Sequence, residues 1–550
     1  MSSLRTSILL AILVATGCAI GPRFSPEIAA SFARDEMRRL ETRSLVVYYP
    51  AQAREAALAT TARIESCATA LRSAVNPTAK RDKLVVLVTS AEFNNAFVRA
   101  RVAGSPAEMV VPLQMGVELF NFFDFGVGNI PDIACHESVH YVQLEEIDGL
   151  WRFLNLVFGD LATPNLSTER WFIEGLATWF EGRLGHPSGR PHSPLWEAMF
   201  ASGIASQGWT LHAGQLSPAH RELFPFGGEY LAGSQFVGWL ARTYGEDKLW
   251  QLVRRQGNSI FFPFGVTLRF DAVYGRTIGA LLEQFNRYLR AHRVVRERAS
   301  SQRVIHPDAG QFARLASAPD GSLALLSIDL DRETHLEVFE PDGRLRFSRR
   351  LRSVFPFRDW IAPHPASISG LSFAADGRSL FLFAEDVGVD TASTYALRQF
   401  DAHQGDHLRT WRGVRGLGGD VSPDGKSYVF ISIDKDATNL ARLDLATGRV
   451  EVLTAFSARE SIGGVAISPD GRRVAFSRRT AEGFDLFLRE EDGSVRALTS
   501  DGRFNYGAQW RSPEELVFMR EHEERSQAHL LSLASGEVKP LTDAPYAVLD

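Results

Sequence analysis

The spacing of apolar residues changes partway along the chain and divides it into two regions. Before about residue 300, apolar residues recur at helical spacing in several long stretches, and short apolar runs between them predict strands. The clearest helical stretches are residues 52–75, 229–256 and 277–299, and the strand-like runs include residues 44–51 and 82–90. This mixture predicts an α+β domain over residues 28–300.

Two further elements are predicted between residues 90 and 115. The stretch "SAEFNNAFVRAR", residues 90–101, opens with a serine that is soon followed by a glutamate, which predicts a capped helix. The stretch "EMVVPLQM", residues 108–115, is short and apolar and predicts a strand. From Pro131 onward the pattern is helical.

After about residue 305, short strands alternate with Asp-Gly turns in a repeating unit. Each unit holds a turn such as "SPDG" and a second hairpin that ends in a segment such as "VRALT", which makes four strands. Successive units are 56, 48, 46 and 44 residues apart when aligned on Gly321, Gly377, Gly425, Gly471 and Glu515. A four-stranded unit that recurs at this spacing is typical of a β-propeller, in which blades stack around an axis to cover each other's faces. We therefore expect a propeller over residues 305–550.

These repeats resemble the blades of TolB-type propellers, on the "SPDG" turn followed by Lys or Arg and on the "LT" that ends the second hairpin. The resemblance covers residues 305–550 and implies a propeller that usually has six blades, whereas five repeats are visible. Two explanations stay open. Strands from elsewhere in the chain close the last blade, or the sequence stops before the natural protein ends.

Composition and charge narrow the function classes. The chain is 45% hydrophobic and 23% charged, as expected for globular domains. Its formal net charge of -5 provides no basic excess to neutralise phosphates, so we expect no nucleic-acid partner.

The amino-terminal residues have the layout of a secretory signal: one cation, Arg5, then an apolar run, then small residues. The segment "ATGC", which ends at Cys18, resembles the cleavage region of bacterial lipoproteins, with Ala15 where leucine is usual. The resemblance implies that residues 1–18 form a lipoprotein signal and that Cys18 carries lipid. We expect a protein of the bacterial cell envelope, on the periplasmic side and anchored to the outer membrane. A plain secretory signal with an incidental cysteine is the alternative.

Two cysteines remain, Cys67 and Cys135, and both lie in predicted helices. Cysteines in an oxidising compartment can pair. Buried cysteines also occur as unpaired apolar residues. The sequence leaves both possibilities open.

A candidate metal site lies in the stretch "ACHESVHYVQ". His136 and His140 are four residues apart, so on a helix both imidazoles project from one face and can reach one metal ion. Glu137 lies beside the first histidine and can take a proton from a water molecule at the metal. A catalytic zinc site needs a third protein ligand. The metzincin pattern is excluded because Gln143 and Glu146 stand where it has Gly and His.

The third ligand is expected on a second helix. Glu174 lies in the middle of "RWFIEGLATWFEG", a segment so rich in aromatic residues that it predicts a buried helix. A buried carboxylate is costly unless it is paired or bound to a metal ion. Glu174 is therefore the candidate ligand.

The two stretches "HESVH" and "WFIEGLATWFE" together resemble the HExxH and WxxEGxAxxxE motifs of gluzincin metallopeptidases, the peptidase MA clan. The resemblance implies a zincin-like fold with one zinc ion on His136, His140 and Glu174, and with Glu137 as the general base. It also implies that Glu181 holds a ligand histidine by its second ring nitrogen. In the alternative interpretation Glu181 is a solvated carboxylate at the end of the helix.

The resemblance covers roughly residues 40–295 and points to an oxyanion donor. Its families often place a tyrosine at the start of a later helix, and Tyr230 in "GGEYLAGSQF" matches that place. Tyr244 is a weaker candidate because it precedes Gly245, which stops the helix. In the alternative interpretation Tyr230 only packs its ring and bonds its hydroxyl locally.

The substrate is less well indicated. Aminopeptidases of this clan carry a Gly-x-Met-Glu-Asn segment on an upstream edge strand, and this chain has only Glu108 and Met109 there. We therefore expect an endopeptidase whose peptide or protein substrate pairs with the strand at residues 108–115.

Taken together, the sequence predicts a secreted or lipid-anchored zinc metallopeptidase that hydrolyses peptide bonds with zinc-activated water and Glu137 as general base. The propeller would bind substrates or an envelope protein partner, and the lipid on Cys18 would bind the membrane. Two alternatives stay open. One is an envelope propeller that binds or scaffolds partners beside a catalytically silent zinc domain. The other is a zinc hydrolase of a non-peptide envelope substrate.

Overall fold

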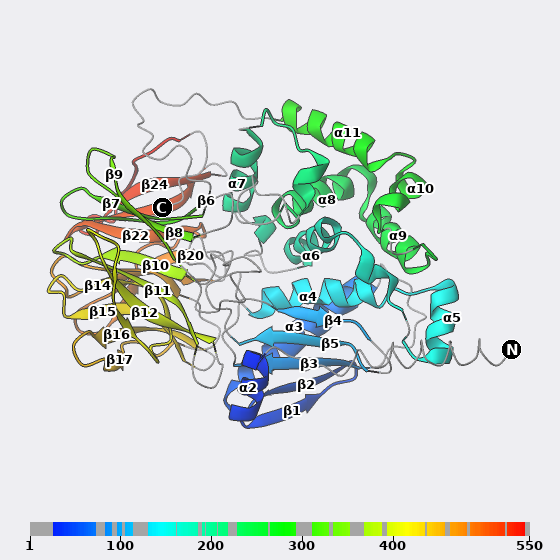
Figure 1. Ribbon diagram of the computed structural model, residues 1–550, viewed down its shortest axis with the longest axis horizontal. Coiled ribbons are helices and arrows are strands. Elements are labelled where there is room, and N and C mark those ends of the chain that lie inside the picture. Colours follow the sequence, from blue (N-terminus) through cyan, green and yellow to red (C-terminus); the bar gives the residue numbers. More distant parts are fainter. Residues whose placement is uncertain are drawn as a thin grey trace.

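The structure, a computed structural model, describes residues 26–72, 83–90, 96–101, 105–113, 130–160, 162–184, 190–192, 194–205, 207–217, 228–261, 265–292, 311–328, 334–351, 368–387, 393–434, 437–456, 462–480, 484–522 and 525–544. Cys18 lies outside these residues, so the lipoprotein signal stays a prediction. Figure 1 shows an α+β part, here called the N-terminal domain (residues 26–292), beside a stack of sheets, here called the propeller (residues 311–544).

The N-terminal domain is built on a five-stranded sheet with the order β1-β2-β3-β5-β4. β2, β3 and β5 run parallel, while β1 pairs antiparallel with β2 and β4 pairs antiparallel with β5. The strands are β1 Met37–Glu41, β2 Leu45–Pro50, β3 Leu84–Thr89, β4 Phe97–Arg99 and β5 Glu108–Pro112.

Side chains of alternate strand residues pack on opposite faces of this sheet, as the two-residue period of a strand requires. Val86 and Val88 of β3 belong to the large core that also contains residues of α3 and α4. Leu87, which lies between them, packs with Ile28 of α2 in a smaller cluster. The helices are α2 Pro26–Arg34, α3 Arg54–Arg72, α4 Ile130–Leu144, α5 Gly149–Phe158, α6 Arg170–Leu184, α7 Pro194–Ala205, α8 Leu231–Tyr244, α9 Glu246–Gly257, α10 Phe270–Tyr274 and α11 Ile278–Ala291.

The helix predicted over residues 90–101 is wrong at its carboxyl end, because Phe97–Arg99 form strand β4. Phe97 pairs with Val110 and Arg99 with Glu108 of β5, so backbone pairing outweighs the local helix signals there. Residues 91–95 lie outside the described residues. The strand predicted from "EMVVPLQM" is present as β5.

The expectation that a substrate pairs with this strand as an edge strand is also wrong. β5 lies inside the sheet, between β3 and β4, and all five of its residues are buried. Its backbone groups therefore already have partners along much of both sides. The position of β5 therefore gives no support for an endopeptidase.

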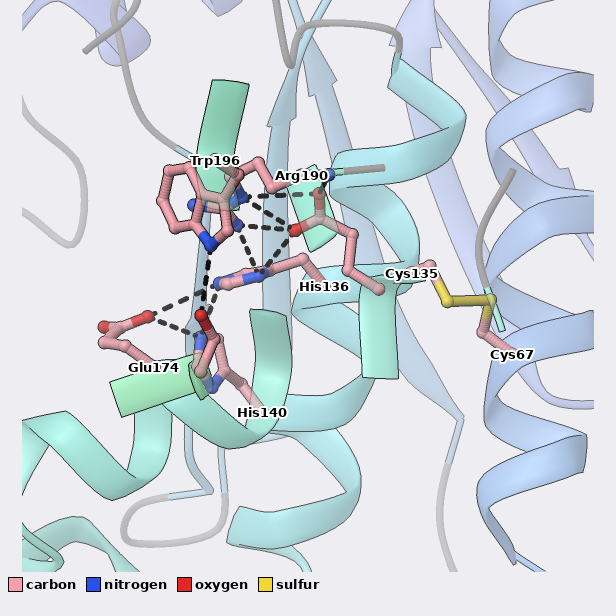
Figure 2. A network of polar contacts seen from close by, with 9 residues as sticks. Cys67, Cys135, His136, His140, Glu174, Arg190 and Trp196 are labelled. Carbon is pink, nitrogen blue, oxygen red and sulfur yellow. Dashed lines mark hydrogen bonds and ion pairs between the residues drawn. A yellow bond between two sulfur atoms is a disulfide. The ribbon is translucent and has the colours of Figure 1, made fainter. Parts of the chain in front are cut away.

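Cys67 and Cys135, whose pairing the sequence left open, form a disulfide that joins α3 to α4 (Figure 2). Their Cα atoms are 5.5 Å apart, and both side chains are buried. The covalent bond fixes α4 to the helix packed beside it one residue before His136.

The propeller consists of five four-stranded antiparallel sheets, and each sheet uses four strands that are consecutive in the chain. Among the described residues, therefore, no sheet takes a strand from elsewhere. The Asp-Gly turns lie between the first and second strands, and Gly321, Gly377, Gly425 and Gly471 adopt positive φ angles of 86°, 68°, 68° and 75°, which suit glycine. The strands are β6 Gln311–Ser317, β7 Leu323–Ile328, β8 Thr334–Phe339, β9 Leu345–Arg350; β10 Ile368–Phe373, β11 Ser379–Val387, β12 Ser393–Asp401, β13 His407–Trp411; β14 Gly416–Val421, β15 Ser427–Asp434, β16 Ala437–Asp444, β17 Val450–Val452; β18 Ile462–Ile467, β19 Val474–Arg479, β20 Phe484–Arg489, β21 Val495–Ala497; and β22 Asn505–Ser512, β23 Glu515–His522, β24 Arg525–Ser532, β25 Val538–Pro540.

The "LT" that ends each of the last three repeats has a structural use. In these blades the threonine hydroxyl bonds to a polar side chain at an equivalent place in the third strand: Thr454 to Asn439, Thr499 to Asp485, and Thr542 to Gln527. The chain segment after the outer strand is thereby tied to the third strand of its blade, which explains why the sequence repeats this position.

The two parts of the molecule share one hydrophobic core. Phe484, Phe504 and Tyr506 of the propeller belong to the same buried cluster as Trp196 and Phe200 of α7. Figure 1 shows α7 on the side of the N-terminal domain that faces the propeller, near β24. In the part of the chain that the structure describes, no helix is long and apolar enough to cross a bilayer.

Removal of the disulfide should destabilise the N-terminal domain. The bond closes a loop with a sequence separation of 68 residues, and the loss of such a cross-link costs about 4 kcal/mol in the chain-entropy account. We expect the double variant Cys67→Ser/Cys135→Ser to unfold at clearly lower urea concentration. A reducing agent should shift the wild-type midpoint in the same direction and leave that of the double variant unchanged. Equal midpoints for the oxidised wild type and the double variant would contradict this.

Candidate metal centre

Three side chains from two packed helices converge on one point. His136 and His140 lie one turn apart on α4, and Glu174 approaches from α6 (Figure 2). The two Nε2 atoms are 3.1 Å apart. Glu174 Oε2 lies 3.4 Å from His136 Nε2 and 3.2 Å from His140 Nε2. The structure thus brings together the three residues that the sequence proposed as ligands.

This arrangement suits a small cation. Tetrahedral donors at the usual zinc distances stand about 3.3 Å from one another, which is close to the three separations observed. Two imidazole Nε2 atoms and a carboxylate oxygen are also donors that zinc commonly takes. His140 Nδ1 is buried and has no hydrogen-bond partner among the described residues. These three side chains form the cluster among the described residues whose donor atoms could hold one metal ion.

Glycine at two positions lets α6 and α8 approach closely enough to build the site. A Cβ at Gly175, next to Glu174, would lie 2.6 Å from the backbone carbon of Gly233. A Cβ at Gly233 would lie 2.5 Å from the carbonyl oxygen of Trp171. Any larger residue at either position would push the helices apart and move the start of α8 away from Glu174.

Burial dominates the electrostatics of the candidate ligands and base. Burial disfavours the ionised form of Glu174, but His140 and His136 outweigh it and hold the pKa of this carboxyl well below its usual value. Burial raises the pKa of Glu137 to about 7, because its weaker favourable contacts with His140 and Arg190 do not compensate. Glu137 therefore lies among charged groups in a site with little water, where proton transfer to or from a carboxyl is accessible near neutral pH.

Tyr230, the candidate oxyanion donor, faces the same centre. It occupies the N-cap position of α8, and its ring centre lies 6.3 Å from that of His136, with an angle of 28° between the ring planes. Burial and the negative charge of Glu174 raise the pKa of the phenol well above its usual value. The hydroxyl therefore keeps its proton and can donate a hydrogen bond. Tyr244, the weaker candidate, instead donates a hydrogen bond to Gln284 on α11.

Glu181 lies on the other side of His136, as the sequence suggested. Its Oε2 atom is 3.3 Å from His136 Nδ1, and the carboxyl is completely buried. Burial opposes ionisation, but Arg190 and His136 outweigh it and lower the pKa of Glu181 to about 2. The group is therefore a carboxylate at neutral pH and can accept the Nδ1 proton of His136.

Arg190 is a site residue that sequence reasoning missed. Its guanidinium is buried and forms two-atom contacts with Glu181, the shortest of them 2.6 Å. It also stacks against Tyr230, with its Cζ atom 5.3 Å from the ring centre. Its Cζ atom lies 5.7 Å from the ring centre of Trp196 (Figure 2). No motif contains this arginine. The signal was that a buried Glu181 needs a positive partner nearby in the chain.

His136 Nδ1 has two neighbours that call for opposite tautomers. Arg190 Nη2 lies 2.8 Å from Nδ1 and can only donate, which would leave the proton on Nε2. Glu181 can only accept, which places the proton on Nδ1 and frees the Nε2 lone pair. Binding of a cation at Nε2 selects the second state. Glu181 is then the hydrogen-bond partner of His136, and Arg190 keeps Glu181 charged.

The centre is connected to the propeller through α7. Trp196 covers Arg190 and donates from Nε1 to Ser234 Oγ on α8 at 3.1 Å. Residues of α7 also share the core that contains propeller residues. A shift of the propeller against α7 would therefore displace Trp196, which packs on Arg190. Arg190 in turn contacts the candidate ligand His136.

Comparisons with known proteins give limited guidance. No family model matches the chain. An uncharacterized protein of Treponema pallidum (strain Nichols) is 25% identical over 298 residues, which are 51% of this chain and 23% of that protein, so the match spans about a quarter of the relative's length. The solved TolB from Acinetobacter baumannii is 18% identical over 42% of this chain and 55% of its own, with a TM-score of 0.33. The β-propeller domain of the Trilobed protease from Pyrococcus furiosus is 14% identical over 42% of this chain and 69% of its own, with a TM-score of 0.30. The assignment of a propeller rests on the strand order described above and not on these likenesses.

Loss of Arg190 should be costly because it leaves a buried carboxylate without its cation. We expect Arg190→Met to lower the free energy of unfolding by about 3–5 kcal/mol. Adding Glu181→Gln should recover much of the loss, since the neutral amide removes the unpaired charge. The matched control is Arg183→Met: Arg183 pairs with Glu246 at the surface, and its loss should cost about 1 kcal/mol or less. Urea unfolding of the four proteins measures this, and equal losses for Arg190→Met and Arg183→Met would contradict it.

Proposed function

We propose that the N-terminal domain is a zinc-dependent hydrolase that cleaves peptide bonds. The observation that carries this proposal is the convergence of His136, His140 and Glu174 beside a second buried carboxyl, that of Glu137. A structural zinc site uses four protein ligands, whereas a catalytic site keeps a position open for water or substrate. Three converging ligands beside a buried carboxyl favour the catalytic kind.

Each residue would have its own role in hydrolysis. His136, His140 and Glu174 would hold the zinc ion, which when bound supplies a Lewis acid that polarises a carbonyl and makes water more acidic. Glu137 would take the proton of the attacking water and deliver it to the leaving amine. Tyr230 would donate its hydroxyl proton in a hydrogen bond to the oxygen on which negative charge develops. Its raised pKa supports the role of donor.

Glu181 and Arg190 would orient His136 and do not need to touch the substrate. A carboxylate that accepts from Nδ1 fixes the ring and directs the Nε2 lone pair toward the metal position. Arg190 keeps that carboxylate ionised in a buried setting. The substrate would approach from the side of His140 and Glu174, whose side chains are 13% and 12% exposed, whereas that of His136 is 4% exposed.

The propeller would select what reaches this centre. The propeller contacts α7, which carries Trp196 against Arg190, and this contact supports a role in admitting or positioning substrate. The same contact also suits a propeller that docks the enzyme on an envelope protein. The secretory layout of the first eighteen residues and the Cys67–Cys135 disulfide support a location outside the cytoplasm, because structural disulfides persist mainly in oxidising compartments.

The proposal is tested by Glu137→Gln. The amide cannot accept the proton of the attacking water, so we expect hydrolysis of a peptide library to fall by about a hundredfold or more, while the zinc content per chain stays that of the wild type. The matched control is Glu283→Gln, a carboxylate exposed on α11, which should leave the rate unchanged. Peptide cleavage by Glu137→Gln at the wild-type rate would overturn the proposal.

A further inference from the structure

Helix α5, Gly149–Phe158, has no buried residue although most of its side chains are apolar. Leu156 is 85% exposed, and Phe153 and Phe158 are 61% and 64% exposed. Figure 1 shows α5 at the side of the molecule opposite to the propeller. An amphipathic helix of a globular domain normally turns its apolar side chains to the core, and α5 does the reverse.

Polar contacts hold α5 in this orientation. Trp151 Nε1 donates to the carbonyl oxygen of Ser259 at 2.8 Å. The Asn155 side chain bonds to both the N–H and the carbonyl oxygen of Ala162, at 2.9 Å and 2.8 Å. The helix is therefore attached through its polar groups, and its apolar side chains are left facing water.

The segments beside α5 continue the same surface. Ser259 precedes Ile260 and Phe261. Arg269 donates to the carbonyl oxygen of Phe261 at 3.0 Å, and Leu268 directly precedes Arg269 in the chain. Gln256, on the neighbouring α9, bonds to the carbonyl oxygen of Pro164 at 3.3 Å, close in the chain to Leu166. We call the exposed apolar residues of these segments the α5 face: Leu150, Phe153, Leu156, Val157, Phe158, Leu166, Ile260, Phe261 and Leu268.

The α5 face is not a chance scatter of surface residues. Of the eighteen large apolar side chains that are exposed in the described part of the chain, these nine lie in α5, in residues 259–261 and 267–269, which hydrogen bonds join to α5 and to each other, and in residues 164–167, which bond to the neighbouring α9. Contiguous apolar surface of this kind marks a place where a soluble domain meets a partner or a membrane. Phenylalanine and leucine that stand out on a short helix are the residues with which peripheral proteins enter the interface of a bilayer.

Charge identifies the partner. Arg152 is the one ionisable side chain within α5, and it is exposed, as is Arg255 at the end of α9. Arg269 lies where the α5 face continues past Phe261. Three acids lie near these arginines: Asp148 and Asp160 stand outside the two ends of α5, and the exposed Asp271 lies two residues after Arg269. Within α5 itself the only charge is therefore positive, on a chain whose formal net charge is -5, and a cation among exposed apolar side chains complements a surface of anionic lipid headgroups.

We propose that the α5 face docks on a bilayer that contains anionic lipids, with Leu156 and its apolar neighbours inserted among the acyl chains and Arg152 at the headgroups. A lipid on Cys18, which the sequence predicts, would hold the chain at the same membrane. This docking does not depend on the hydrolytic function proposed above.

Site-directed spin labelling of the full chain tests this. The chain has three cysteines, and two of them form the disulfide. Leu156→Cys therefore adds a free thiol for the spin label. The wild type treated with the same reagent measures how much label attaches to Cys18. On vesicles of phosphatidylethanolamine and phosphatidylglycerol, we expect collisions of the label with a water-soluble nickel chelate to fall severalfold and collisions with oxygen to rise. Leu156 is so exposed that its replacement costs the fold little, and Phe158→Cys repeats the test.

The matched control is Leu408→Cys in the propeller, where Leu408 is 52% exposed. Its label should stay equally accessible to the nickel chelate with and without vesicles. The proposal is overturned if the label at residue 156 also stays accessible on vesicles. It is equally overturned if that label is already shielded in solution with dipolar coupling between chains, which would assign the α5 face to a second copy. Equal shielding on phosphatidylcholine vesicles would refute the role given to the arginines.

Discussion

The carboxylate of Glu174, held against two histidine nitrogens in a nearly dry site, is the interaction on which the rest of the N-terminal domain depends. A buried carboxylate is unfavourable unless positive charge or a metal ion stands beside it, and His136 and His140 lie within 3.4 Å and 3.2 Å of its Oε2 atom. Donors this close repel one another unless a proton or a cation is shared among them. A shared proton or a bound cation would relieve this repulsion, and the surrounding fold keeps the donors converging.

Three features of the fold provide that convergence. The Cys67–Cys135 disulfide fixes α4 to α3 one residue before the first histidine. The close crossing of α6 and α8 at Gly175 and Gly233 sets the distance from Glu174 to the start of α8, where Tyr230 lies. Arg190 neutralises Glu181 on the far side of His136 and connects this pair, through Trp196, to the helix that meets the propeller. The centre and the propeller thus share one packed framework.

Much of this framework could be predicted from the sequence because periodicity and local spacing determine it. The repeats predicted five four-stranded sheets, and the helical patterns predicted α3, α4, α8, α9 and α11. Features that depend on contacts far apart in the chain could not be predicted in this way. The segment at Phe97–Arg99 carries helix signals but pairs with β5, Arg190 belongs to no motif, and the pairing of the cysteines depends on how α3 packs against α4. The stretch that forms α5 is apolar enough for a core helix, and only the tertiary structure places its side chains in water.

The most direct test of the central claim is zinc K-edge X-ray absorption of the purified protein, prepared without chelator, together with the variant His140→Ala. We predict nitrogen and oxygen ligands at about 2.0–2.1 Å and no sulfur ligand, with the zinc signal lost or strongly reduced in the variant and kept in a control, His403→Ala, which alters an exposed propeller residue. A zinc environment that is unchanged in His140→Ala, or one that contains sulfur, would contradict the assignment of His136, His140 and Glu174 as the metal ligands.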